Sequence, residues 1–158
     1  MLVVAMLIGC ANPARPTVGP IEFTDAKGAP VSAVTTLAVN QPVYMVATVS
    51  NDSDLLGVSW TVTCGSVGTT GTGGTAINTA CGVVSPPQTA SGPVPTYPSS
   101  GIITTYTAPS MIPKGGTVTI TAHATSLPSA VSNVTLTIVQ TPATSSGIAL
   151  PASAFAAD

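Results

Sequence analysis

Apolar and polar residues alternate along several short stretches of this chain, and an alternation of period two predicts β-strands. The pattern is clearest over residues 117–125 and recurs over residues 131–140 and 57–64. Shorter candidate strands are residues 21–24, 31–39, 42–50 and 102–107. Since each stretch has one apolar face, these strands predict two packed antiparallel sheets. The inward faces place five residues in the predicted core: Trp60, Val118, Ile120, Leu136 and Ile138.

The composition strengthens the prediction of an all-β fold. Apolar residues make up 44% of the chain, and many are Val, Ala and Ile set among Thr, Ser and Gly, which suits half-buried strands. Charged residues make up only 5%, yet no stretch of about 18 apolar residues suggests a membrane span. The cations Arg15, Lys27 and Lys114 are scattered, so the chain lacks the basic patch that nucleic-acid binding requires. We therefore expect no nucleic-acid partner.

The N-terminal residues have the pattern of an export signal. Residues 2–8 form an apolar run that is too short to span a bilayer but suits the core of a secretion signal. Residues 7–10, Leu-Ile-Gly-Cys, resemble a bacterial lipobox, in which the signal is cut before the cysteine and the thiol is lipidated. This predicts a signal over residues 1–10, lipid on Cys10 and a proline-rich tether over residues 11–20. The alternative is a buried N-terminal strand with an ordinary cysteine.

The cysteine count fits this interpretation. An exported protein with three cysteines leaves one to explain. If Cys10 carries lipid, Cys64 and Cys81 remain as a pair that closes a loop of about 18 residues. Closing such a loop stabilises the folded state by about 3 kcal/mol. Such a disulfide persists in an oxidising compartment, which agrees with export. The alternative is two free thiols in a reduced protein.

Residues 65–101 are the irregular part of the chain. They are rich in Gly, Thr and Pro and show no periodic stretch beyond Val83–Val84, so we expect a long loop whose first half the disulfide restrains. The domain that carries this loop is expected over residues 21–140. Residues 141–158 are rich in Ala, Ser and Pro, and we expect a linker-like tail.

Candidate reactive residues are few and isolated. His123 is the single histidine, and the alternation places it on a polar face without a nearby acid, so no catalytic triad is expected. Asp52 and Asp54 follow Asn51 and can offer oxygen ligands to calcium, but an ordinary Asn/Asp turn is the favoured interpretation. Residues 68–74 are glycine-rich but lack the lysine of a phosphate-binding loop. We predict no catalytic residue, no metal and no cofactor.

Four short runs resemble bacterial immunoglobulin-like domains, which occur in cell-surface proteins and adhesins. They are Val-Ser-Trp-Thr-Val-Thr-Cys at 58–64, Cys-Gly-Val-Val-Ser-Pro at 81–86, Thr-Tyr-Thr-Ala-Pro at 105–109 and Gly-Thr-Val-Thr-Ile-Thr-Ala at 116–122. The resemblance covers roughly residues 21–139, and a longer insertion at about 85–101 departs from it. It implies an immunoglobulin-like β-sandwich of about seven antiparallel strands, with Trp60 packed across the sandwich, Tyr106 and Pro109 at a corner, and no enzymatic activity.

The leading hypothesis is a lipid-anchored module of the cell envelope, outer membrane or cell surface, which acts as a spacer, scaffold or adhesive domain. Its expected partners are the membrane, through lipid on Cys10, and other proteins or further copies of itself at sheet edges. The alternative is a subunit of an extracellular fibre that assembles by adding a terminal segment to a neighbouring sheet. A carbohydrate-binding module is disfavoured because aromatic residues make up only 4% of the chain.

Overall fold

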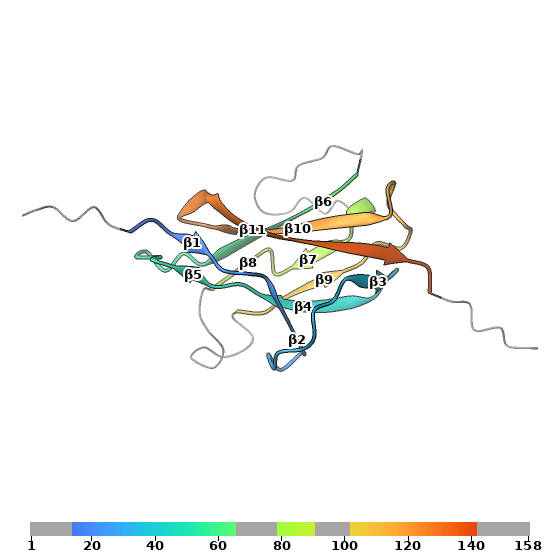
Figure 1. Ribbon diagram of the computed structural model, residues 1–158, viewed down its shortest axis with the longest axis horizontal. Coiled ribbons are helices and arrows are strands. Elements are labelled where there is room, and N and C mark those ends of the chain that lie inside the picture. The colour runs from blue at the N-terminus through green and yellow to red at the C-terminus, as the bar shows by residue number, and fades with distance from the viewer. Residues whose placement is uncertain (1–13, 66–78, 91–101, 142–158) are drawn as a thin grey trace, which may run out of the picture.

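The computed structural model describes residues 14–65, 79–90 and 102–141. In these residues one short 3-10 helix, η1 (Thr79–Cys81), accompanies eleven β-strands, which confirms the all-β prediction (Figure 1). The strands are β1 (Thr17–Val18), β2 (Glu22–Thr24), β3 (Thr36–Ala38), β4 (Pro42–Val46), β5 (Val49–Ser50), β6 (Val58–Cys64), β7 (Val83–Ser85), β8 (Gln88–Thr89), β9 (Thr104–Thr107), β10 (Thr117–Ala124) and β11 (Leu127–Val139).

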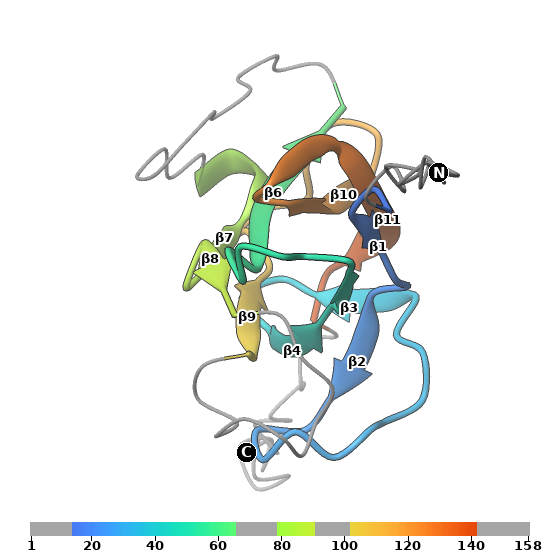
Figure 2. The same cartoon turned by 90° about the vertical axis from the view of Figure 1, so that its left-hand side faces the viewer.

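The strands form three sheets, of which the two larger ones make two layers (Figure 2). The five-stranded sheet has the order β3-β11-β10-β6-β8, and the four-stranded sheet has the order β2-β4-β9-β7. The small third sheet pairs β1 with β5. Every pairing is antiparallel except that of β3 with β11. Buried side chains from both large sheets belong to one hydrophobic cluster, so the arrangement is sandwich-like.

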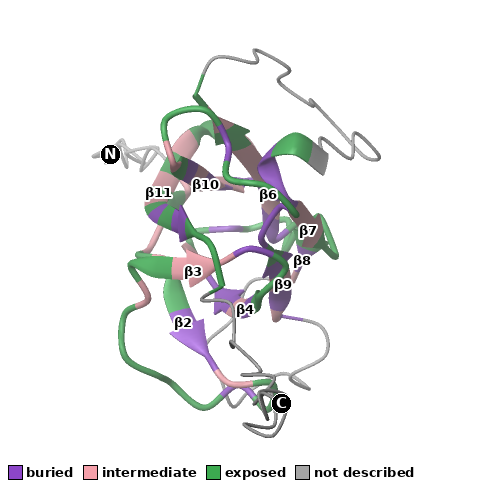
Figure 3. Cartoon of the chain, turned by 90° about the vertical axis from the view of Figure 1, so that its right-hand side faces the viewer, coloured by how far each residue is buried: buried purple, intermediate pink, exposed green. Residues whose placement is uncertain are grey.

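The core follows from the alternation in sequence. Along β10 the even-numbered residues 118–124 are buried and the odd-numbered ones are more exposed, because successive side chains of a strand point to opposite faces (Figure 3). All five predicted core residues are buried, with Trp60 exposing only 4% of its surface. The opposite sheet completes the cluster with four large buried residues: Phe23, Val43, Met45 and Tyr106.

The expected strand over residues 42–50 is divided between two sheets. β4 pairs with β2 and β9, whereas β5 pairs with β1. Between them the Gly19 N–H donates to the Thr48 carbonyl at 2.8 Å, which draws the chain toward β1. The apolar alternation continues across this break, so the sequence pattern does not reveal it.

The segment 31–39 crosses from one sheet to the other. The Val31 N–H donates to the Phe23 carbonyl in the four-stranded sheet at 3.0 Å, whereas Thr36–Ala38 forms β3 beside β11. The expected edge strand is therefore present, but shorter than residues 31–39.

β11 begins earlier than residue 131, and its start is irregular. His123 lies opposite Val131, but the next residue of β10, Ala124, lies opposite Leu127. Residues 128–130 are thus extra residues on β11, which makes a bulge next to the β10–β11 turn.

Part of the segment 65–101 belongs to the sheets. β7 pairs with β9, and β8 pairs with β6, so residues 83–89 extend both layers. The Trp60 N–H donates to the Pro87 carbonyl at 2.8 Å, and the Trp60 Nε1–H donates to the Thr89 hydroxyl at 3.0 Å. The signal 1–10, residues 11–13 of the tether, and the tail from residue 142 lie outside the described residues, as do residues 66–78 and 91–101.

Candidate functional site

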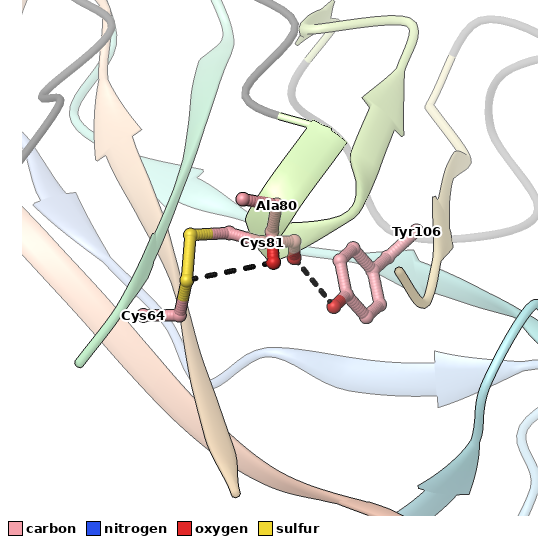
Figure 4. The surroundings of a disulfide bond; sticks show 4 residues. All are labelled: Cys64, Ala80, Cys81 and Tyr106. Atoms are coloured by element: carbon pink, nitrogen blue, oxygen red, sulfur yellow. Dashed lines mark hydrogen bonds between the residues drawn. A yellow bond between two sulfur atoms is a disulfide. The ribbon is translucent and has the colours of Figure 1, made fainter. Parts of the chain in front are cut away.

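A disulfide joins the end of β6 to the 3-10 helix (Figure 4). Cys64 and Cys81 are the two cysteines paired by the sequence argument, and their Cα atoms lie 5.5 Å apart. Cys81 is almost completely buried, whereas Cys64 is partly exposed. The Ala80 carbonyl oxygen lies 3.8 Å from the Cys64 Sγ, a contact rather than a donated hydrogen bond because the bridged sulfur carries no proton.

A buried tyrosine fastens this disulfide to the other sheet. Tyr106 on β9 is fully buried, and its hydroxyl donates to the Cys81 carbonyl at 2.8 Å. Burial raises the pKa of the Tyr106 phenol, so it keeps its proton and acts as a donor. The neighbouring Gly82 has φ 89°, and a Cβ there would meet the Tyr106 hydroxyl at 2.7 Å, so the backbone lies directly against the ring. This corner is a structural lock between the two layers.

His123 is held between two neutral groups on the outer face of the five-stranded sheet. Its Nδ1 lies 3.1 Å from the Pro128 carbonyl, and its Nε2 lies 3.0 Å from the Thr61 hydroxyl. Because a carbonyl can only accept, the geometry places a proton on Nδ1, whereas the Thr61 hydroxyl can pair with Nε2 as donor or acceptor. The histidine therefore connects β6, β10 and the β11 bulge, and both ring nitrogens have neutral partners.

Asp52 anchors the loop that precedes β6. It is 8% exposed, and its Oδ2 accepts a hydrogen bond from the Gly57 N–H at 2.8 Å, while its Oδ1 has no hydrogen-bond partner. Asp54 is exposed and accepts a hydrogen bond from the Ser53 hydroxyl at 3.4 Å. Within the residues that the structure describes, no three His, Cys, Asp or Glu side chains gather as a metal site. The carboxylate of Asp52 thus serves a turn whose closing Gly57 has φ 75°.

Asp25 organises a second turn, between β2 and β3. Its Oδ1 accepts the N–H groups of Ala29 and Lys27, each at 2.8 Å. These hydrogen bonds favour the carboxylate, so they hold the pKa of Asp25 below its ordinary value of 3.8.

Large exposed apolar residues occur at both ends of the sandwich. Leu55 and Leu56 precede β6 and are 74% and 47% exposed, whereas Met111 and Ile112 precede β10 and are 75% and 42% exposed. Since β6 and β10 are antiparallel, the two pairs lie at opposite ends of the strands. Met111 and Ile112 also line a small hollow next to the disulfide, together with Ala80, Pro109, Ser110 and Pro113.

The predicted lipidation site, Cys10, lies outside the described residues, as does the glycine-rich segment 68–74. In the part of the chain that the structure describes, no helix is long and apolar enough to cross a membrane. No protein family, curated protein or solved structure matches this chain.

The contacts that organise these corners were not predicted from sequence. The hydrogen bonds Tyr106–Cys81 and Trp60–Thr89 join residues far apart in the chain, so no local pattern marks them. The ordinary turn favoured at residues 51–54 is present, but the hydrogen bond from the Gly57 N–H to the Asp52 carboxylate was not predicted.

Proposed function

We propose that this chain is a non-catalytic, exported module with an immunoglobulin-like β-sandwich, anchored to the cell envelope by lipid on Cys10, where it acts as a spacer, scaffold or adhesive domain.

The strand order supports the immunoglobulin-like assignment. Such sandwiches place strands A, B, E and D in one sheet and C, F and G in the other. Here β2, β4, β9 and β7 take the first order, and β6, β10 and β11 take the second. Trp60 on β6 occupies the strand that bears the core tryptophan in immunoglobulin domains.

Three features are particular to this chain. The disulfide joins β6 to η1 instead of joining strands B and F. The buried tyrosine lies on β9, in the position of strand E, instead of strand F. An additional edge strand, β8, follows β7 and pairs with β6. These features support a divergent member of the architecture.

The observation that carries the proposed role is the direction in which the chain enters and leaves the sandwich. Asn51, at the loop end beside β5, donates its side-chain amide to the Arg15 carbonyl, so the N-terminal segment enters there. β11 ends beside Gly116 and Thr117, where β10 begins, so the chain leaves at the end of the strands away from the β10–β11 turn. Figure 1 shows β1 and the tip of β11 at the two ends of the long axis. Because the chain enters at one end of the sandwich and leaves at the other, the module separates its N-terminal and C-terminal segments by the length of the sandwich.

The described side chains also support a role without catalysis. A general base must reach a reacting group and be oriented by a third residue. His123 instead connects a hydroxyl and a carbonyl within the sheet, and Asp52 binds the backbone of its own loop. The function is therefore assigned to the surfaces and ends of the module.

The decisive experiment tests whether Cys10 is lipidated. The chain with residues 1–10 intact is expressed in a bacterium that lipidates exported proteins, in the presence of labelled palmitate, beside the variant Cys10→Ser. The expected result is label in the membrane fraction with the native chain and none with the variant. An unlabelled chain with reduced Cys64 and Cys81 in the cytoplasm would refute the proposal. So would turnover in a hydrolase or transferase screen that disappears with His123→Ala.

A further inference from the structure

One edge of β11 is paired over only part of its length in the described residues, although β1 lies close to this strand. The Thr137 N–H donates to the Thr35 carbonyl on the β3 side at 2.9 Å, whereas the Ile138 N–H donates to the Gly116 carbonyl on the β10 side at 2.8 Å. Backbone groups alternate between the two edges of a strand, so those of Val131, Asn133 and Thr135 point away from β10. In the described part of the chain, no strand pairs with this stretch of the edge.

The free stretch has two well-defined limits. Toward the start of β11 it ends at the bulge of residues 128–130, which His123 holds through the Pro128 carbonyl. Toward the end of β11 it stops at Thr137, where β3 takes over the edge. Five residues, 131–135, therefore form a regular stretch of β11 with which no described strand pairs on this side.

The other sheet edges carry charge, proline or strands of at most three residues, whereas the free stretch of β11 has only the bulge at its start. Edge strands are usually protected by charge, proline or shortness. β2 contains Glu22 and leads into Asp25 and Lys27, β7 is followed by two prolines, and β3 and β8 have at most three residues. Residues 131–139 contain neither a charged residue nor a proline. Val131, 44% exposed, also leaves an apolar side chain on the free stretch.

We propose that residues 131–135 pair antiparallel with the same residues of a second copy of this chain. With Asn133 opposite its counterpart across a two-fold axis, Val131 lies opposite Thr135 of the second copy, and Thr135 opposite its Val131. The three free N–H groups of each copy then meet three free carbonyls of the other, in the pattern of an antiparallel ladder. The exposed Val131 gains an apolar contact with the Thr135 methyl group, since cross-strand neighbours touch.

The orientation of this pair suits adhesion, and this step rests on the proposed function. β11 runs along the long axis of the molecule (Figure 1), so antiparallel pairing points the two N-terminal ends in opposite directions. Two copies tethered through Cys10 would then project from facing surfaces and pair between them. Five residues a side bury only a few hundred Å², well below the roughly 1,200 Å² of a stable complex. The contact is therefore weak for single molecules and gains strength from many anchored copies.

Thiol cross-linking tests the pairing on the full chain, with Cys10→Ser removing the one other thiol. Hydrogen-bonded partners in an antiparallel ladder have Cα atoms about 5.5 Å apart, which a disulfide can span. Asn133→Cys should therefore form a linked dimer under mild oxidation. Thr137→Cys is the matched control, because it lies on the same strand and face but is roughly 27 Å from its counterpart in the proposed pair.

We expect Asn133→Cys to cross-link at least about ten times faster than Thr137→Cys at equal concentration. Equal rates, whether fast or slow, would overturn the proposed pairing. Tryptophan fluorescence of both variants checks that the fold is retained. The result does not depend on lipidation, so it stands or fails separately from the palmitate experiment.

Vesicle clustering tests the facing arrangement. In chain produced without lipidation and with Cys64 and Cys81 bridged, Cys10 is the remaining thiol, and it couples the chain to vesicles bearing maleimide lipid. Light scattering should show clustering that Asn133→Lys abolishes, because it sets like charges directly opposite each other. Thr137→Lys carries the same added charge and should still cluster. Cross-linking without clustering would refute the facing arrangement. Clustering that survives Asn133→Lys would show that pairing of the β11 edges does not link the vesicles.

Discussion

Replacing Tyr106 by Phe isolates the hydrogen bond that locks the disulfide corner to the opposite sheet. The ring stays in place, so no cavity larger than one oxygen arises, but the Cys81 carbonyl loses the hydroxyl that donates to it at 2.8 Å. Both groups lie in a buried corner, since Tyr106 is 0% and Cys81 1% exposed. A buried acceptor left without its donor costs about 1–3 kcal/mol. We expect the free energy of unfolding to fall by about 2 kcal/mol.

Urea denaturation followed by the fluorescence of the single tryptophan measures this change, because Trp60 is buried and becomes exposed on unfolding. With a slope of about 2 kcal/mol per molar urea, the transition midpoint should fall by about 1 M. Tyr44→Phe is the matched control, since Tyr44 is partly exposed on β4 and should change stability by less than about 0.5 kcal/mol. Mass spectrometry confirms that the disulfide is intact in both variants. A midpoint shift no larger than that of the control would refute the lock.

Three further predictions address other parts of the fold. Replacing both Cys64 and Cys81 by Ser should lower the free energy of unfolding by about 3 kcal/mol, measured in urea against the native chain under non-reducing conditions. Trp60→Ala should cost about 3–5 kcal/mol in a denaturation followed by circular dichroism, and a change near zero would mean that the ring is not part of the core. Asp25→Ala should destabilise the protein at about pH 6 but much less at about pH 2. The lowered pKa of the Asp25 carboxyl stabilises the fold above pH 3.8, and this stabilisation is lost as the pH falls through the pKa of the folded state. An equal loss at both pH values, in matched urea titrations, would contradict the assignment to the Asp25 turn.

The strands with one buried face were predictable from sequence because their side-chain period is local. β10 and the second half of β11 lie where the alternation places them, and Trp60 is buried as expected. The division of residues 42–50 was not predictable, because it depends on the pairing of β5 with the distant β1. β8 was not predicted, because its two residues follow two prolines and are too few to show an alternation. Their strand conformation depends on pairing with β6.

The candidate site was predictable only in part. The Cys64–Cys81 pairing was predictable because setting Cys10 aside as the expected lipid site leaves one pair among three cysteines. The outward position of His123 also followed from alternation, but its bonds to Thr61 and Pro128 require knowledge of strand neighbours. The free edge of β11 depends on where β3 joins the sheet and where the bulge begins, and both are properties of the register rather than of the composition.

The disulfide also limits how far the module can lengthen under tension. A chain pulled from its two ends transmits force through the bond between Cys64 and Cys81, whose Cα atoms are 5.5 Å apart. Without the bond, the same stretch of backbone would extend to about 58 Å. An unfolded chain under tension therefore stays shorter by about 50 Å for as long as its surroundings keep the cysteines oxidised. The bond thus couples the reach of the unfolded chain to the redox state of its surroundings.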